Sequence, residues 1–419
     1  MNLNLKYGKS KIYVIFVQKN TMRSLILIVS TVIILILIIQ SCEKLQPAAP
    51  SEDEILDGPI EGLTNAENIQ FLNGDRAFSE VFTSSNGLGP LFVTNSCVSC
   101  HSGDGKGHPF STLTRFGQSD TSGNQFLTMG GPQLQHRAIP GYEPENIPEG
   151  ASFSRFTPPA VTGLGYLQYV TDADILAMAD PNDMNNDGVS GVPNWMPLKD
   201  FLQPSANAIS QNGKYIHRFG KKASAYDLLD QTVGAYNQDM GITSTFSPID
   251  TYSGLSIDPE VSDKDVRDVV FYLETLKAPI QRNKDDPEVV QGKNLFVDIN
   301  CAACHKPTLT TGYSPIDKLS NKTFHPYTDL LLHDMGSNLD DGYTEGAAQT
   351  YEWRTPPLWG LGLSPTTQGG QYFLMHDGRA NSIEEAILMH GGEAQSSKLL
   401  YESLPEQDKR ALIKFLESL

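Results

Sequence analysis

Two copies of one short pattern decide how this chain folds, Cys97-Val98-Ser99-Cys100-His101 and Cys301-Ala302-Ala303-Cys304-His305. Cys-x-x-Cys-His is the attachment pattern of c-type haem. Two thiols at this spacing form thioethers with one macrocycle, and the adjacent His binds its iron. A zinc site does not need a His directly after the second Cys, and a redox pair does not need a distant second copy. The sequence therefore predicts two covalently bound haems, held by Cys97, Cys100, His101, Cys301, Cys304 and His305.

The flanks of the two motifs repeat as well. Leu91-Phe92-Val93 precedes the first motif and Leu295-Phe296-Val297 precedes the second at the same distance, and Thr157-Pro158-Pro159 is matched by Thr355-Pro356-Pro357. Each half closes on a segment with apolar residues at helical spacing, 265–276 and 408–419. We predict two fused cytochrome c-type domains, mainly α with extensive loops, at 61–285 and 286–419. The first domain carries a large insertion at about 160–217.

The first 42 residues have the pattern of an export signal. Residues 1–41 contain five basic residues and no acidic one, and an aliphatic run from Ser24 to Ile39 leads to Ser41-Cys42. A Cys at this point is typical of a lipoprotein, so we predict a signal sequence at 1–42 that ends at a lipidated Cys42. The alternative is an uncleaved membrane anchor, for which the run is short. Residues 43–60 are predicted to be a flexible tether, and the protein is expected in the cell envelope, facing the periplasm or the exterior.

The chain is strongly acidic. Its formal charge is −18, and removal of the five basic residues before Cys42 would take it to −23. This charge disfavours binding to nucleic acid and favours a partner with a basic face. A small electron-donor protein, a cytochrome or a cupredoxin, is therefore expected to dock through basic residues.

The insertion contains one candidate metal site. Asp183, Asn185 and Asp187, followed by Gly188, match the first half of a calcium loop. Asn194 stands where such a loop has its bidentate Glu. The alternative is an Asn/Asp/Gly turn that needs no ion.

The second axial ligand of each iron decides its chemistry, because Met opposite His gives a high-potential electron carrier. Met375 is the predicted ligand of the second haem, since it directly precedes the repeated Gly378-Arg379 turn. Met335 is its rival, and His217 occupies the corresponding place in the first half. The remaining candidates are His333, His376, His108 and His136.

Longer stretches resemble the di-haem oxidoreductase family, which is related to the bacterial di-haem cytochrome c peroxidases. The resemblance runs from about Phe71 to Leu419. It is carried by Gly87-Leu-Gly-Pro-Leu-Phe92, Pro158-Pro-Ala-Val-Thr-Gly-Leu-Gly165, Gly234-Ala-Tyr-Asn-Gln-Asp-Met-Gly-Ile-Thr243, Tyr327-Thr-Asp-Leu-Leu-Leu-His-Asp-Met-Gly336 and His376-Asp-Gly-Arg-Ala-Asn-Ser-Ile-Glu-Glu-Ala386.

The resemblance implies an enzyme that reduces hydrogen peroxide at the N-terminal haem, with electrons relayed by the C-terminal haem. In the peroxidases a Gln and a Glu-Met pair face the peroxide-binding haem, and Gln231 and Asp239-Met240 are the counterparts here. Asp replaces Glu, and the spacing is shorter. The alternative interpretation is a non-catalytic di-haem electron-transfer lipoprotein that serves a partner enzyme or an iron-uptake system. Oxidation of an organic or thiol substrate is a third option.

Overall fold

A computed structural model describes residues 22–33 and 50–419 of the chain. The chain divides into two units, Met1–Ser51 and Glu52–Leu419. Residues 22–33 are helical. Within the described ranges no helix is both long enough and apolar enough to cross a membrane. Cys42, most of the predicted signal and the first part of the predicted tether lie outside the described residues.

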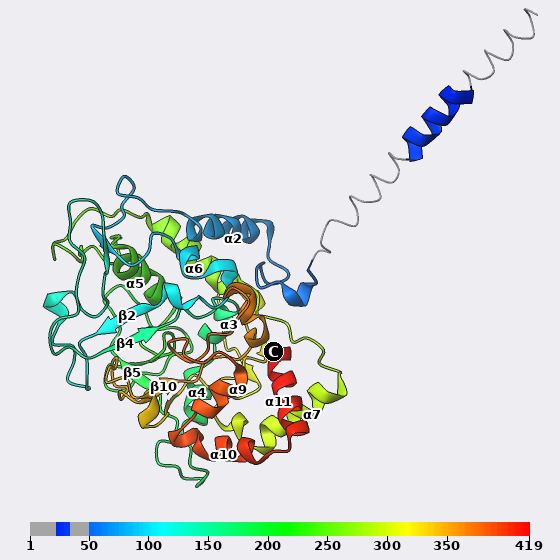
Figure 1. The fold of residues 1–419 in the computed structure, drawn as a ribbon. Coiled ribbons are helices and arrows are strands. Elements are labelled where there is room, and N and C mark those ends of the chain that lie inside the picture. The colour runs from blue at the N-terminus through cyan, green and yellow to red at the C-terminus, as the bar shows by residue number, and fades with distance from the viewer. Residues whose placement is uncertain (1–21, 34–49) are drawn as a thin grey trace, which may run out of the picture. The chain divides into compact units, whose positions relative to one another are not determined.

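The second unit contains ten α-helices and ten short strands within residues 50–419 (Figure 1). The helices are α2 (Asn65–Phe78), α3 (Leu164–Gln168), α4 (Asp172–Met178), α5 (Leu228–Met240), α6 (Asp263–Thr275), α7 (Pro287–Asp298), α8 (Ser364–Thr367), α9 (Ile383–Met389), α10 (Gln395–Ser403) and α11 (Glu406–Ser418). The strands are β1 (Leu91–Phe92), β2 (Leu113–Phe116), β3 (Arg137–Ala138), β4 (Phe153–Phe156), β5 (Asn194–Met196), β6 (Tyr215–His217), β7 (Leu309–Thr310), β8 (Thr323–Phe324), β9 (Leu332–Asp334) and β10 (Glu352–Arg354).

The fold class is mixed. Helices hold 36% of the described residues and strands 11%, so the expectation of a mainly helical protein is only partly confirmed. The strands form five antiparallel pairs, β1 with β3, β2 with β4, β5 with β6, β7 with β8 and β9 with β10. These pairs are ribbons that brace long loops, and no extended sheet forms from them. Periodicity does not reveal strands of two to four residues, which explains why the sequence did not predict them.

Two helix pairs frame the two Cys-x-x-Cys-His motifs. Helix α2 precedes the first motif and packs along α6, and α7 precedes the second motif and packs along α11 (Figure 1). Helices α6 and α11 match the two predicted closing segments to within two residues at each end. The starts of α6 and α7 carry common helix-start signals. Ser262 caps α6 by accepting a hydrogen bond from the backbone N–H of Asp265, and Asp286 caps α7, whose first residue is Pro287.

A glycine sits at the same place in each helix crossing. A Cβ on Gly74 of α2 would overlap the backbone carbonyl of Asp268 in α6, and a Cβ on Gly292 of α7 would overlap that of Ala411 in α11. The axes approach this closely only because neither glycine has a side chain. The internal duplication is therefore present in the packing as well as in the sequence.

The two halves are joined by many contacts. Val192 of the insertion forms a β-bridge with Leu332, and Val170 forms one with Thr311. Ser190 donates its backbone N–H and its hydroxyl to Glu393 at 3.0 and 2.8 Å. Residues Glu52–Leu419 accordingly form one compact unit. The boundary near residue 285 stays a prediction, and the insertion packs against the second half.

Candidate functional site

Both Cys-x-x-Cys-His motifs open onto one cavity. Its volume is about 520 Å³, and its lining is mostly apolar. The cavity wall includes both cysteines and the histidine of each motif, together with segments from both halves of the chain. Each motif forms a short 3-10 turn, Cys97–Ser99 and Cys301–Ala303. The structure therefore brings the two motifs to a common interior space.

The two motif histidines have the same local geometry. The Nδ1 atom of His101 lies 2.9 Å from the carbonyl oxygen of Pro159, and that of His305 lies 3.0 Å from the carbonyl oxygen of Tyr327. A carbonyl can only accept, so each Nδ1 carries the proton and each Nε2 keeps its lone pair. Burial lowers the pKa of both imidazoles to about 4, so both are neutral at physiological pH. A neutral imidazole with an oriented Nε2 is ready to bind a metal.

An aromatic pair holds each of these histidines in place. The ring of Phe78, at the end of α2, lies 6.2 Å from that of His101 and 5.4 Å from that of Tyr272 in α6. In the second half, Phe296 lies 6.4 Å from His305 and 5.5 Å from Phe415 in α11. The helix pairs therefore position the histidines.

The four motif thiols are not paired with one another as disulfides. Burial raises the pKa of Cys97 and Cys301 to about 12 and that of Cys100 to about 11, so these thiols are protonated at neutral pH. Reactive redox pairs and zinc sites rely on the thiolate, which this environment disfavours.

Four cations on the cavity wall form no ion pair with a carboxylate in the described residues. One is Lys398, and the other three are Lys106, Lys221 and Arg354. Burial lowers the pKa of Lys106 to about 8 and that of Arg354 to about 10, and it places the pKa of Lys221 well below its usual value. Asp377, the carboxylate that acts on both lysines, is itself paired with Arg379.

Enclosed, unpaired cations are costly unless a bound group neutralises them. Haem carries carboxylate groups, so Lys106, Lys221 and Arg354 fit it. Free Nε2 atoms and buried protonated thiols beside the same cavity fit it too, and the residues present therefore suit this prosthetic group.

Asp239 lies on the wall of this cavity at the end of α5. Its Oδ1 accepts a hydrogen bond from the side-chain amide of Gln133, and no described residue donates to its Oδ2. Burial raises the pKa of Asp239 to about 6, against the opposing effects of Gln133 and of the charge on Arg115. Asp239 in turn raises the pKa of Cys97 and Cys100, which places it close to the first motif.

Arg115 connects Asp239 to the second half of the chain. Its guanidinium donates to the side-chain oxygens of Gln133 and Gln238 at 3.2 and 2.7 Å. It also forms an ion pair with Glu345 at 2.7 Å, and Glu345 further accepts a hydrogen bond from Ser224 at 2.6 Å. These side chains form a continuous polar network on an otherwise apolar wall.

The sequence predicted part of this network. Gln231 lines the cavity, and its role stays a prediction; the amide that contacts Asp239 is that of Gln133. Sequence reasoning missed Gln133, Arg115 and Glu345. Arg115 stands alone in β2, and no local pattern marks it. Its partners are set by the pairing of β2 with β4 and by a β-bridge to Gln133.

Met375 and Met335 both line the cavity in the second half. Each packs against the cluster that contains Trp353, and Met375 also packs against the core around α7 and α11. Met375 has a backbone φ of +65°, which is unusual for a residue other than Gly, Asn or Asp. Its assignment as iron ligand stays a prediction.

His333 and His376 are also on the cavity wall, and both are engaged by carboxylates. His333 contacts Asp329 through Nε2 at 2.9 Å and Glu393 through Nδ1 at 2.7 Å. Burial alone would lower the pKa of His333, but these hydrogen bonds and one with Cys304 raise it well above its usual value. His376 contacts Asp341 through Nε2 at 2.7 Å and stacks on Trp353 with 3.7 Å between ring centroids.

Three histidines that the sequence put forward do not line the cavity. His217 is buried elsewhere, where its Nδ1 lies 3.2 Å from the carbonyl oxygen of Tyr215 and its ring packs on Tyr226. His108 stacks on Phe110, and His136 is exposed.

The candidate calcium loop has the geometry of a turn. Asp183 accepts hydrogen bonds from the backbone N–H groups of Asp187 and Gly188 at 2.9 and 3.2 Å. Asn185 donates its side-chain amide to Asp187 at 3.1 Å. Local hydrogen bonds of this kind form with or without an ion, so calcium binding stays a prediction.

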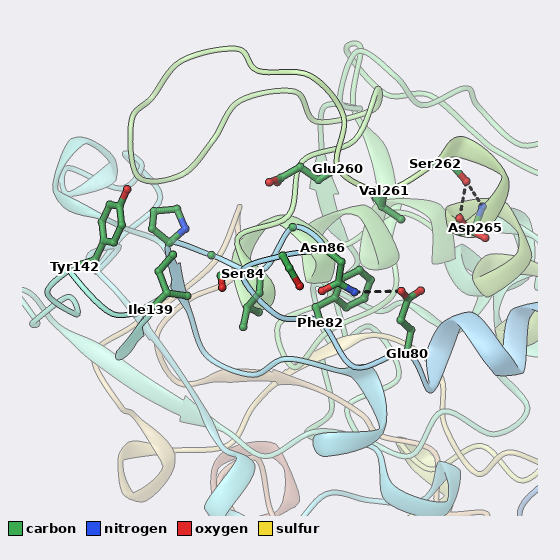
Figure 2. A pocket seen from close by; sticks show the side chains of 15 residues that line it. Glu80, Phe82, Ser84, Asn86, Ile139, Tyr142, Glu260, Val261, Ser262 and Asp265 are labelled. Carbon is green, nitrogen blue, oxygen red and sulfur yellow. Dashed lines mark hydrogen bonds between the residues drawn. The ribbon is translucent and has the colours of Figure 1, made fainter.

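A second cavity of about 590 Å³ lies on the surface near the chain that leads to the first motif. Figure 2 shows Glu80, Glu260 and Asp265 around it, with Phe82, Ile139 and Tyr142 among its apolar residues. No residue of either Cys-x-x-Cys-His motif lines it. The chemistry of the site therefore belongs to the interior cavity.

Two oriented histidines with free Nε2 atoms, the neighbouring thiols and a shared cavity fit a haem protein. Residues 153–419 match the family described as "Di-haem oxidoreductase, putative peroxidase". The match covers more than half of the chain, so this protein belongs to that family and binds haem. The resemblance inferred from the sequence is confirmed.

Other comparisons add little. No protein with a curated description matches the chain. Hydrazine synthase from Kuenenia stuttgartiensis is a similar solved structure, with 15% sequence identity and a TM-score of 0.35. The likeness covers 90% of this chain and 98% of that one, but it is too remote to bear on function.

Proposed function

We propose that this protein is a di-haem c-type peroxidase of the cell envelope that reduces hydrogen peroxide in the N-terminal half of its cavity. The observation that carries the proposal is the network of Asp239, Gln133, Arg115 and Glu345 beside the first Cys-x-x-Cys-His motif. The network puts the buried carboxyl group of Asp239 and the guanidinium group of Arg115 on the wall of a cavity whose residues fit haem, which supports the proposal.

The residues that would hold the two haems all line the cavity. Cys97 with Cys100 and Cys301 with Cys304 would form the thioethers, and His101 and His305 would bind iron through Nε2. Lys106, Lys221 and Arg354 would neutralise haem carboxylates. When bound, the haems supply the redox-active iron that exchanges electrons with peroxide and with a donor protein.

The proposed work of the chain is to move a proton. Gln133 fixes Oδ1 of Asp239 and leaves Oδ2 free to take a proton from one peroxide oxygen and deliver it to the other. A carboxyl group with a pKa of about 6 is suited to both steps near neutral pH. The Arg115 guanidinium stabilises negative charge that develops nearby. Gln231, on the same helix and in the same cavity, orients the bound oxidant.

Electrons are proposed to come one at a time from a small donor protein with a basic face and to pass through the C-terminal half. A lipid on Cys42 would hold the enzyme at a membrane. A calcium ion at Asp183, Asn185 and Asp187 would stiffen the insertion where it meets the second half.

Substitution of Asp239 by Asn tests the proposal. General acid–base catalysis typically contributes about 10²–10⁴-fold, so we expect a loss of that order in peroxide turnover with both haems retained. Asn237→Ala is the control, because Asn237 is on the same helix but its side chain bonds to the Ile249 carbonyl outside the cavity. Gln133→Leu should be more damaging than Gln231→Leu.

Unchanged turnover in Asp239→Asn would refute the assignment of the proton carrier. The alternative function is a non-catalytic electron-transfer lipoprotein. Two low-spin haems that do not react with peroxide, in either the oxidised or the half-reduced protein, would favour that alternative.

A further inference from the structure

A sixth ligand for the second haem can be sought among the nine histidines of the chain, all of which lie in the described residues. Five of them line the interior cavity, namely His101, His305, His333, His376 and His390. The first two are the motif histidines. His390 was not singled out by the sequence, because no repeat or motif contains it.

His390 has the local geometry of the two motif histidines. It directly follows α9, and its Nδ1 lies 2.7 Å from the carbonyl oxygen of Ala386. Nδ1 must therefore donate, which fixes the tautomer with a lone pair on Nε2. No described residue contacts this Nε2.

The other two cavity histidines lack this freedom. Both ring nitrogens of His333 face carboxylates, those of Glu393 and Asp329. In His376 the Nε2 atom is held by Asp341, and the ring lies flat on Trp353. His390 is thus the one cavity histidine outside the motifs whose Nε2 is available.

His390 is also close to the second motif. Its Nδ1 and its backbone N–H bond to the carbonyls of Ala386 and Ile387, which pack in the same hydrophobic cluster as Cys301 of that motif. Leu412 and Leu416 belong to the same cluster and also line the cavity, and both lie in the second half, as Cys301 and Cys304 do. Burial lowers the pKa of His390 itself, so its imidazole is neutral as a ligand must be.

We propose that His390 is the sixth ligand of the C-terminal haem, opposite His305, in place of Met375 or Met335. This proposal rests on the proposed di-haem function and makes it more specific. Bis-histidine ligation gives a lower reduction potential than His/Met ligation, since Met raises the potential of a haem. The donor would then have to reduce a low-potential haem.

The test uses the purified haem-loaded protein and optical and EPR spectroscopy. We expect the oxidised wild type to lack the near-infrared band of a methionine–iron bond. His390→Gly should convert one of the two haems to high spin, and added imidazole should restore the low-spin spectrum. His390→Met should raise the midpoint potential of that haem. Met375→Leu and Met335→Leu remove the rival ligands and should leave the C-terminal haem low spin.

The opposite pattern would overturn the inference. A methionine–iron band in the wild type that disappears in Met375→Leu or Met335→Leu, with His390→Met unchanged, would assign the ligand to that methionine. High-spin haem in His376→Gly but not in His390→Gly would assign it to His376. Haem content distinguishes this failure from failure of the proposed function. A protein with two haems and a different ligand would refute only the ligand assignment, whereas a protein without two haems per chain would refute both.

Discussion

At the scale of single residues, Asp239 illustrates how environment decides chemistry. Its raised pKa, about 6, comes first from burial, and the charge of Arg115 opposes the shift. In the proposed mechanism the deprotonated form accepts the proton, so we expect kcat/KM for peroxide to fall as the pH drops through about 6. Arg115→Gln removes the opposing charge and should move this acid limb to higher pH. The pH profile of peroxide turnover measures both effects.

The control for this prediction is Arg76→Gln, which removes an exposed arginine on α2. It should leave the acid limb where it is in the wild type. An acid limb that stays in place in Arg115→Gln, or that persists in Asp239→Asn, would show that another group titrates.

At the scale of elements, the crossing of α7 and α11 depends on one missing side chain. Gly292→Ala puts a methyl group against the backbone carbonyl of Ala411, which cannot move without its helix. Overpacking of this kind costs about 1–3 kcal/mol, more than the gain in helix propensity from Ala. We expect a lower free energy of unfolding by chemical denaturation.

Asn294→Ala, an exposed change two positions along α7, is the matched control for Gly292→Ala. Surface substitutions of this kind usually stay within about 0.5 kcal/mol of the wild type. Equal stabilities for the two variants would mean that the helices separate without cost. Gly74→Ala should repeat the effect at the crossing of α2 and α6.

At the scale of the whole molecule, the two halves are joined by buried polar contacts as well as by β-bridges. Arg115 pairs with Glu345, and Ser154 donates to Asp341 at 2.6 Å. Asn194 donates to the Glu345 carbonyl at 3.1 Å. Because neither half satisfies these groups alone, we expect one unfolding transition for residues 52–419 by calorimetry, coincident with loss of the haem spectrum. Two resolved transitions would show instead that the halves unfold independently.

The sequence by itself determined the features that depend on local pattern. The two Cys-x-x-Cys-His motifs, the internal repeat and the closing helices α6 and α11 follow from spacing and periodicity, which are encoded within short segments. Asp239 and Gln231 were found through resemblance to a family.

Only the tertiary structure decided which side chains meet in the cavity. The contacts of Gln133 with Asp239 and of Arg115 with Glu345 join segments 106 and 230 residues apart in the chain. The place of His390 on a cavity wall shared with the first motif is likewise set by the fold. The structure also showed that His217 is buried away from the cavity. The physical reason is that these contacts depend on how distant segments pack against one another, and the spacing of residues within one segment does not determine that packing.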